Sequence, residues 1–165
     1  MTLVTRSVSS PVGELLLVGD GERLHALHLT RPFPASPPPG AVADDRAFPE
    51  AVRQLDEWFA GRRRDFHLAL ELHGTTWQRR VWDVLLEIPF GETVTYGEVA
   101  RRAGSPRSAR AVGHAVGRNP VCIVVPCHRV VGAGGALGGY SGGIDNKRWL
   151  LAHERSGRPS FPTGR

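Results

Sequence analysis

Hydrophobic positions divide the chain into an N-terminal part that alternates as β-strands do and a C-terminal part with helical spacing. In the first 30 residues, LVTRSVSS, ELLLV and RLHALHL are strand-like runs, and Pro11-Val12-Gly13 and Gly19-Asp20-Gly21 separate them as turns. This pattern predicts a β-meander over Leu3 to Leu29. Residues 31–49 are rich in proline and alanine, which predicts an irregular surface loop.

Two further elements complete the predicted N-terminal part. Apolar residues recur at helical spacing over residues 49–60, and Gly61 is placed to end that helix. The run from Phe66 to Leu72 predicts one more strand. We therefore expect residues 1–73 to form a small α/β subdomain, in which no catalytic constellation is visible.

The C-terminal part is predicted to be mostly helical. Thr75 or Thr76 can cap a helix through about Ile88, and Thr95 has capping-box spacing to Glu98 in a helix that runs to Gly104. Ser105 and Pro106 then begin a further helix, PRSARAVGHAVGR. Two short helices joined by a tight glycine-containing turn are typical of a helix-turn-helix motif.

The end of the chain is predicted to hold one last helix. It would run from Asp145 to about Arg155, with Asp145 or Asn146 as its cap. The resulting fold class is α+β, with a small β-meander and helix subdomain packed on a winged helix-turn-helix-like DNA-binding and active-site domain. We expect that second domain to span residues 74–155 and residues 156–165 to be a disordered tail.

Composition is that of an ordinary globular protein. Of the 165 residues, 41% are hydrophobic and 22% are charged. No apolar stretch approaches the roughly 20 residues that span a bilayer, and the N-terminus lacks an export signal's apolar region. We therefore expect a cytoplasmic protein that does not bind a membrane.

Charge is distributed unevenly along the chain. Residues 1–73 carry eight Arg and ten acidic residues, whereas residues 74–155 carry eleven basic and six acidic residues. Between Glu98 and Asp145 there are six arginines and no acid. A field of one sign favours a polyanion such as nucleic acid, although a solvated basic face explains the charge equally well.

Candidate chemistry lies at Cys127. The apolar run from Cys122 to Val125 has strand length, and glycines follow downstream, so Cys127 is predicted where a buried strand meets flexible chain. His128 and Arg129 can stabilise its thiolate. Taken alone, this motif fits a buried structural cysteine as well as a nucleophile.

The blocks RAVGHAVGRNP, IVVPCHRVVG, YSGG and LLAHE occur together between Thr76 and Glu154. At this spacing the chain resembles the methylated-DNA–protein-cysteine methyltransferases, also called O6-alkylguanine-DNA alkyltransferases. The N-terminal half is similar to that family only loosely. The resemblance implies repair of double-stranded DNA by a single, irreversible transfer of the alkyl group from O6-alkylguanine to the protein.

The resemblance also implies a role for individual residues in catalysis. Cys127 would accept the alkyl group, and His128, Glu154 and a water would deprotonate it. Asn119 would hold the turn before the active-site segment. Further residues would line the guanine pocket, with Tyr140 protonating the leaving purine; the pocket residues are Tyr140, Ser141 and Val130.

DNA contacts follow from the same resemblance. Tyr96 would press on the target phosphate, and Arg110 would enter the duplex in place of the extruded base. The start of the recognition helix would add contacts through Arg107, Ser108 and Ala109. We expect a monomer, and the resemblance leaves open cooperative binding along DNA and activity on O4-alkylthymine.

No cofactor and no metal ion is expected. His25 and His28 lie three apart on a predicted strand and so face opposite sides, which argues against a metal ion shared between them. Some relatives bind structural zinc through N-terminal cysteine and histidine, and this chain has no N-terminal cysteine. Cys122 stands where relatives often have proline or a small residue, which leaves the preferred alkyl size open.

Two other functions compete with alkyl transfer. A non-catalytic module that senses alkylated bases is disfavoured because such proteins replace the acceptor cysteine. A Cys-His hydrolase acting on a small molecule would not need a helix-turn-helix motif or the arginine-rich stretch.

Overall fold

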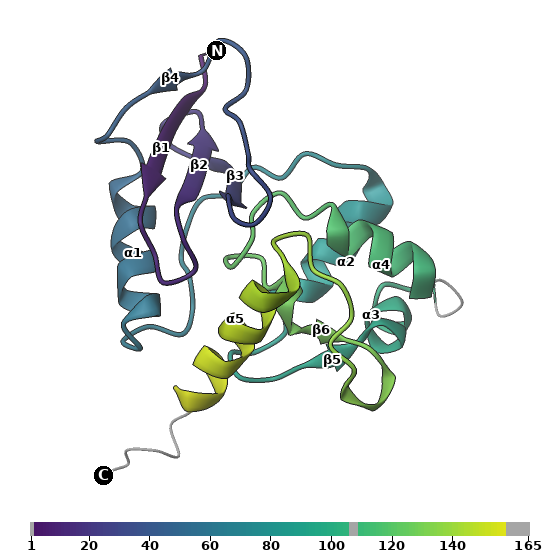
Figure 1. The fold of residues 1–165 in the computed structure, drawn as a ribbon. Coiled ribbons are helices and arrows are strands. Elements are labelled where there is room, and N and C mark those ends of the chain that lie inside the picture. The colour runs from purple at the N-terminus through teal and green to yellow at the C-terminus, as the bar shows by residue number, and fades with distance from the viewer. Residues whose placement is uncertain (1, 106–108, 158–165) are drawn as a thin grey trace. The chain divides into compact units, whose positions relative to one another are not determined.

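A computed structural model describes residues 2–105 and 109–157 of the chain. The fold consists of two units, which Figure 1 shows in one view. Of these residues, the first unit holds 2–73 together with 120–124, and the second holds 74–105, 109–119 and 125–157. Together they form a mixed α+β protein, as the sequence predicts.

The predicted meander is present in the first unit. Strands β1 (Val4–Val8), β2 (Leu15–Gly19) and β3 (Leu24–Leu29) pair antiparallel in sequence order. In register, Val8 faces Leu15 and Leu15 faces Leu29. All five residues of β2, an inner strand of the sheet, are buried.

Helix α1 (Pro49–Phe59) lies along this sheet in Figure 1. Gly61 follows it with a φ of 78°, a left-handed conformation that glycine adopts without strain and that ends many helices. Leu55 and Trp58 of α1 are fully buried, as are Leu17 and Leu27 of the sheet. These side chains form the core of the first unit.

Three expectations for the first unit are wrong. The loop of residues 31–49 contains a two-residue strand, β4 (Val42–Ala43), which pairs parallel to β1. Residues 66–72 form no strand: only Leu70 bridges to β3, at Leu24. The apolar run of residues 122–125 is not a strand either. It turns sharply, with Ile123 at a φ of 72°, and a single bridge joins the preceding Val121 to Leu27.

Two helices of the second unit begin where the sequence predicts caps. The Thr75 hydroxyl accepts from the Gln78 backbone N–H, and the Gln78 side chain accepts from the Thr75 backbone, which starts α2 (Thr76–Leu86) with a capping box. Thr95 likewise accepts from Glu98 at the start of α3 (Tyr96–Arg102). Helix α4 (Ala109–Gly117) contacts both α2 and α3.

Short elements surround Cys127. Strand β5 (Val94–Thr95) pairs parallel with β6 (Val130–Val131), and the 3-10 helix η1 (Cys127–Arg129) immediately precedes β6. A second 3-10 turn, η2 (Ala133–Gly135), leads into the glycine-rich loop. Helix α5 (Ile144–Ser156) begins after Gly143, so neither Asp145 nor Asn146 is its cap.

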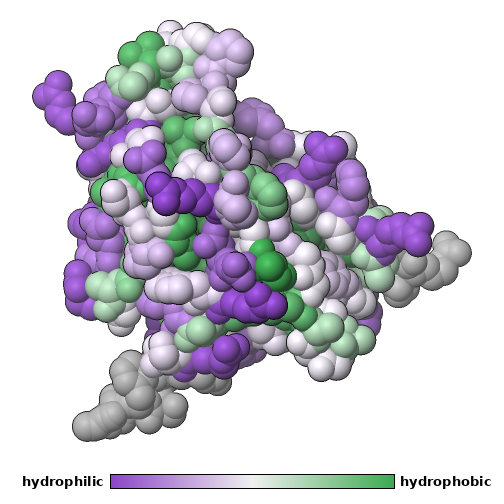
Figure 2. Space-filling model, viewed as in Figure 1, coloured by the Kyte–Doolittle hydropathy of each residue, from purple (hydrophilic) through white to green (hydrophobic). Residues whose placement is uncertain are grey.

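The surface is mainly polar. On the face shown in Figure 2, hydrophilic residues predominate and hydrophobic ones form scattered patches. Leu86, at the end of α2, is 45% exposed. Among residues 2–105 and 109–157, no helix combines the length and apolar character needed to cross a bilayer.

Candidate active site

Cys127 lies in η1 rather than at the end of a strand, and it is only 1% exposed. Its backbone N–H donates to the Val125 carbonyl at 2.8 Å, and the Arg129 N–H donates to Pro126 at 3.0 Å. Asn119, directly after α4, donates from Nδ2 to the same Val125 carbonyl at 2.8 Å. The tight turn before Cys127 is therefore held by a buried amide.

His128 and Glu154 are in direct contact. His128 Nε2 lies 2.8 Å from Glu154 Oε2, and both side chains are buried. Because Nε2 contacts the carboxylate, the other ring nitrogen, Nδ1, faces away from Glu154. This arrangement fixes the orientation of the imidazole, as a carboxylate does for a catalytic histidine.

Arg129 completes the network from the other side. Its guanidinium donates to both Glu154 oxygens, at 2.7 to 3.0 Å, and to the Ile88 carbonyl. The guanidinium also lies 5.8 Å from the ring centre of Phe90. Glu154 is in the last turn of α5, where the helix dipole disfavours a negative charge, so a buried cation is needed to keep it ionised.

Protonation states follow from these contacts. Burial lowers the pKa of His128 below its ordinary value, more strongly than Glu154 raises it, so the ring is neutral at pH 7. Burial alone would raise the pKa of Glu154, but its hydrogen bonds with His128 and Arg129 and the positive charge of Arg129 bring it to about 2. A neutral imidazole held by an ionised carboxylate is the state required of a general base.

Lys147 is the only lysine in the sequence, and its side chain is fully buried. Its Nζ donates to the Val130 carbonyl at 2.6 Å and to the Gly139 carbonyl at 3.1 Å. It therefore ties β6, beside Cys127, to the loop that carries Tyr140. Burial lowers the pKa of Lys147, and a thiolate at Cys127 opposes that shift, which places the ammonium within electrostatic reach of the sulfur.

Tyr96, the first residue of α3, packs on the same loop. Its ring lies 6.0 Å from Lys147 Nζ, and a Cβ added to Gly138 would come within 2.9 Å of its hydroxyl oxygen. Burial raises the pKa of Tyr96, the charge of Cys127 raises it further, and a hydrogen bond with the Gly139 backbone lowers it. Tyr96 thus contacts the loop before Tyr140 and lies within electrostatic reach of Cys127.

Two family models match the chain along most of its length. The model for the 6-O-methylguanine DNA methyltransferase ribonuclease-like domain matches residues 3–72, and the model for the DNA-binding domain of the same enzymes matches residues 76–156. The chain belongs to the 6-O-methylguanine DNA methyltransferase family.

Relatives in this methyltransferase family align over nearly their whole length. A methylated-DNA–protein-cysteine methyltransferase of Mycobacterium leprae (strain TN) is 49% identical over 150 residues, which are 91% of each chain. The enzyme of the same name from Mycobacterium tuberculosis is 48% identical over 155 residues, 94% of each chain.

Solved structures of this methyltransferase family share the fold. The O6-methylguanine methyltransferase of Mycobacterium tuberculosis has a TM-score of 0.89 at 46% identity, covering 98% of both chains. The structure of Mycobacterium tuberculosis OGT in complex with DNA has a TM-score of 0.88 at 48% identity, covering 95% of this chain and 96% of that one.

The remaining predicted residues lie at three places in this methyltransferase. Val130 is buried directly after η1, while half-buried Tyr140 and exposed Ser141 precede α5. Ala109 and Arg110 are exposed at the described start of α4. Arg107 and Ser108 fall outside the described residues.

The arginine-rich stretch is less uniformly basic than its sequence indicates. Arg101 and Arg102 both pair with Glu98, and Arg129 pairs with Glu154. Among the described arginines of this stretch, Arg110 and Arg118 remain exposed without such an acid beside them. The electrostatic argument for a polyanion therefore rests on α4 and its end.

Sequence reasoning missed Lys147 and understated Arg129. The sequence indicates only a source of positive field at Arg129, whereas in the fold this residue anchors Glu154. A signal for Lys147 existed, since the chain uses arginine at every other Lys or Arg position. Arginine and lysine are not interchangeable where a compact, titratable charge is required.

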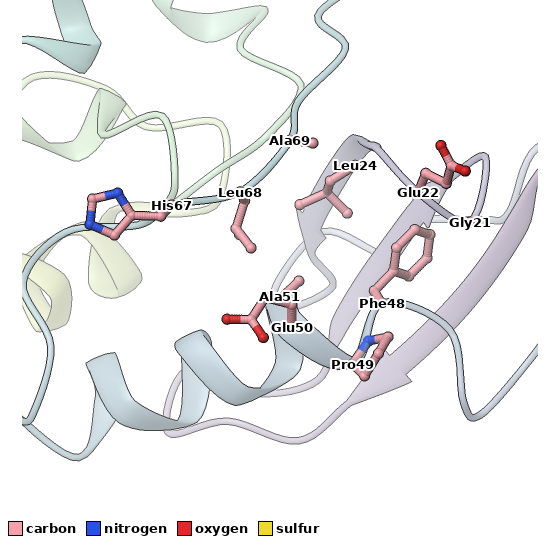
Figure 3. A pocket seen from close by; sticks show the side chains of 10 residues that line it. All are labelled: Gly21, Glu22, Leu24, Phe48, Pro49, Glu50, Ala51, His67, Leu68 and Ala69. Carbon is pink, nitrogen blue, oxygen red and sulfur yellow. The ribbon is translucent and has the colours of Figure 1, made fainter.

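Each unit has a hollow on its surface. One of about 390 Å³ in the second unit is lined by Gly91, Thr93, Leu151, Glu154 and Arg155. The other, of about 340 Å³, belongs to the first unit (Figure 3). Its walls come from β3, the start of α1 and residues 67–69, and none of the predicted site residues lines it.

Proposed function

We propose that this chain repairs double-stranded DNA by moving the alkyl group of O6-alkylguanine onto Cys127, once per molecule. The observation that carries the proposal is a buried cysteine followed directly by a neutral histidine, which an ionised carboxylate orients. The names of the relatives and the DNA complex of the Mycobacterium tuberculosis protein support the same reaction.

The proposed reaction begins with removal of the thiol proton. His128 Nδ1 accepts it from Cys127, directly or through one water, while Glu154 holds the ring from Nε2. The thiolate then attacks the alkyl carbon, so that a C–S bond forms as the C–O6 bond breaks. The electron pair passes to the purine, which takes a proton from the Tyr140 hydroxyl.

Single turnover follows from the product. A thioether is a poor leaving group, and the site offers no second nucleophile to the alkyl carbon in this proposal. The spent Cys127 therefore stays alkylated. Neither cysteine of the chain forms a disulfide, which suits a thiol chemistry carried out in a reducing cytoplasm.

Burial of Cys127 also determines how DNA must bind. A 1%-exposed sulfur cannot reach an alkyl group inside the base stack, so the nucleotide has to be flipped out, at a cost of a few kcal/mol. Exposed Arg110 at the start of α4 fills the vacated stack in this proposal, and Tyr96 bears on the phosphate. Ala109 and the neighbouring Arg107 and Ser108 add contacts to one DNA duplex per protein monomer.

The proposal is tested by the mass of the intact protein after incubation with a duplex that carries one O6-methylguanine. We expect one methyl group to replace one hydrogen, with a plateau at one per protein however much duplex is added. A parallel duplex with O4-methylthymine tests the breadth of the substrate range. Tight binding without any gain in mass would instead support a damage sensor, and turnover of a small ester without DNA would support a hydrolase.

Lys147→Met is expected to slow methyl transfer about tenfold at pH 7, because loss of the buried cation makes the Cys127 thiolate less favourable. The deficit should shrink at pH 9, where bulk hydroxide helps to form the thiolate. Single-turnover rates at the two pH values measure this, with Arg148→Met, an exposed neighbour, as the matched control. Equal slowing at both pH values would show that Lys147 only holds the loop together.

A further inference from the structure

The turn of residues 88–91, which follows α2, contacts the buried ion pair of Arg129 and Glu154. The Ile88 carbonyl accepts a hydrogen bond from Arg129 Nη1 at 2.5 Å. Later in the turn, the Gly91 N–H donates to Glu154 Oε1 at 3.2 Å. The turn therefore holds the cation at one point and the carboxylate at another.

Proline and glycine determine the path of this turn. Pro89 has no backbone N–H with which to continue α2. Gly91 has a φ of 83°, a left-handed conformation that glycine adopts without strain. Because the chain bends here, the Ile88 carbonyl and the Gly91 N–H both face the same ion pair.

Phe90, in the middle of the turn, contacts the charged group of Arg129 itself. The guanidinium carbon lies 5.8 Å from the centre of the Phe90 ring, within the roughly 6 Å at which an aromatic face attracts a cation. Arg129 is only 6% exposed, and a cation–π contact is stronger when the cation is desolvated. The ring therefore restrains the guanidinium, whose N–H groups reach both Glu154 oxygens.

Helix α5 supports the Phe90 ring in turn. The His153 ring meets the Phe90 ring in a T-shaped contact, with 6.4 Å between centres and 81° between planes. Trp149, one helical turn earlier, stacks on His153 at 5.0 Å and 12°. A Cβ added to Gly157, directly after α5, would come within 3.3 Å of Phe90 Cζ. These contacts leave the Phe90 ring little room to shift.

The two oxygens of Glu154 belong to one rigid carboxylate and are therefore fixed together. Oε1 accepts from Gly91, and Oε2 lies 2.8 Å from His128 Nε2. Arg129 Nε donates to both oxygens at 3.0 Å. Contacts that fix the guanidinium and Oε1 thus also fix Oε2, and with it the imidazole of His128.

We propose that Phe90 is a positioning residue for alkyl transfer, acting through the orientation of Arg129 and Glu154. This inference rests on the proposed transfer to Cys127. It assigns to the turn of residues 88–91 a role in that reaction, although none of its residues touches the alkyl group in the proposal. The sequence indicates this turn only as the end of a helix, because proline and glycine are ordinary helix stops.

The first test compares single-turnover methyl transfer from an O6-methylguanine duplex by the native chain and by variants of Phe90. Phe90→Leu should transfer about tenfold more slowly, because leucine is apolar but has no aromatic face for the guanidinium. Phe90→Tyr keeps that face and should restore most of the native rate. Phe90→Met, which fills more of the ring's volume, takes the place of Phe90→Leu if urea unfolding shows that variant to be unfolded.

The matched control is Phe59→Leu, the same substitution at a half-buried ring that packs on Trp58 in the first unit. It should transfer at the native rate. Affinity for the duplex should be native in Phe90→Leu as well, since the ring is not placed at the DNA. A native transfer rate in Phe90→Leu, or no recovery in Phe90→Tyr, would overturn the proposal.

A double substitution separates positioning from loss of structure. Glu154→Gln removes the carboxylate that Phe90 is proposed to position, so adding Phe90→Leu should slow transfer further by less than about twofold. Two substitutions that act through one group are not additive in this way. An additional tenfold loss in the Glu154→Gln background would show that Phe90 only maintains the fold.

A third readout does not depend on alkyl transfer. The ¹⁵N chemical shifts of the His128 ring show which nitrogen carries the proton, and His128→Gln identifies the signals. We expect the proton on Nε2, toward Glu154, in the native chain and a mixture of the two tautomers in Phe90→Leu. No gain of methyl mass by the native chain would refute the proposed function. Identical His128 signals in the native chain and Phe90→Leu would overturn the positioning role, whichever way the mass measurement falls.

Discussion

Cys127→Ala is expected to abolish methyl transfer completely while leaving affinity for the alkylated duplex nearly unchanged. The sulfur supplies the acceptor electron pair, and alanine offers none. Because the side chain is only 1% exposed and adds little volume, its truncation should leave the DNA-binding surface of α4 intact. Intact-protein mass and duplex binding, measured on the same preparation, test the two halves of this expectation.

Cys122→Ala is the matched control, since Cys122 is the other cysteine and is also buried. It should still gain one methyl group. If Cys122→Ala lost the mass gain and Cys127→Ala kept it, the acceptor would be Cys122. The roles proposed for His128 and Glu154 would then be wrong. A change in the preferred alkyl size in Cys122→Ala would instead give that residue a place at the pocket wall.

Glu154→Gln is expected to slow methyl transfer about 100-fold, because His128 loses the anion that orients it and stabilises its protonated form. Affinity for alkylated DNA should stay within about twofold. Asp145→Asn, on the exposed side of the same helix, should transfer at the native rate. Parallel loss of transfer and DNA affinity would show that Glu154 only maintains the fold.

The same substitution should alter stability and its dependence on pH. Gln leaves the buried Arg129 without a counter-charge, which costs about 3 kcal/mol. In the native chain the pKa of Glu154 is about 2 against an ordinary 4.5, so its contribution is present above pH 4.5 and is lost as pH falls toward 2. Urea unfolding at pH 7 and pH 3 should therefore show a smaller pH effect in Glu154→Gln.

Local signals in the sequence were sufficient to predict the elements that have their own caps, turns and periodicity. The Gly19-Asp20-Gly21 turn and the Thr75 capping box mark the meander and α2 because both are determined within a few residues. The motif around Cys127 alone fitted a structural cysteine as well as a nucleophile, so the chemistry of Cys127 followed from the family resemblance. Its partner Glu154 followed from a resemblance, not from any local pattern.

Elements that depend on distant partners could not be read from the sequence. The run after Val121 is apolar enough for a strand, but its pairing with β3 is limited to the single bridge at Val121, and the rest buries its side chains in a turn. Strands β5 and β6 have two residues each and form by pairing with each other. The contact between the rings of His25 and His73 likewise depends on the bridge between Leu24 and Leu70, which are 46 residues apart in the chain.

The burial of Lys147 has a practical consequence for following the molecule in solution. As the only lysine, it is the only side-chain amine that an acylating reagent can modify, and in the native fold its Nζ is enclosed between two carbonyl oxygens. Its labelling rate therefore reports how often the loop of residues 132–143 separates from β6. Acylation kinetics with and without a duplex would measure the opening of the alkyl-acceptor site on a native chain, without any engineered probe.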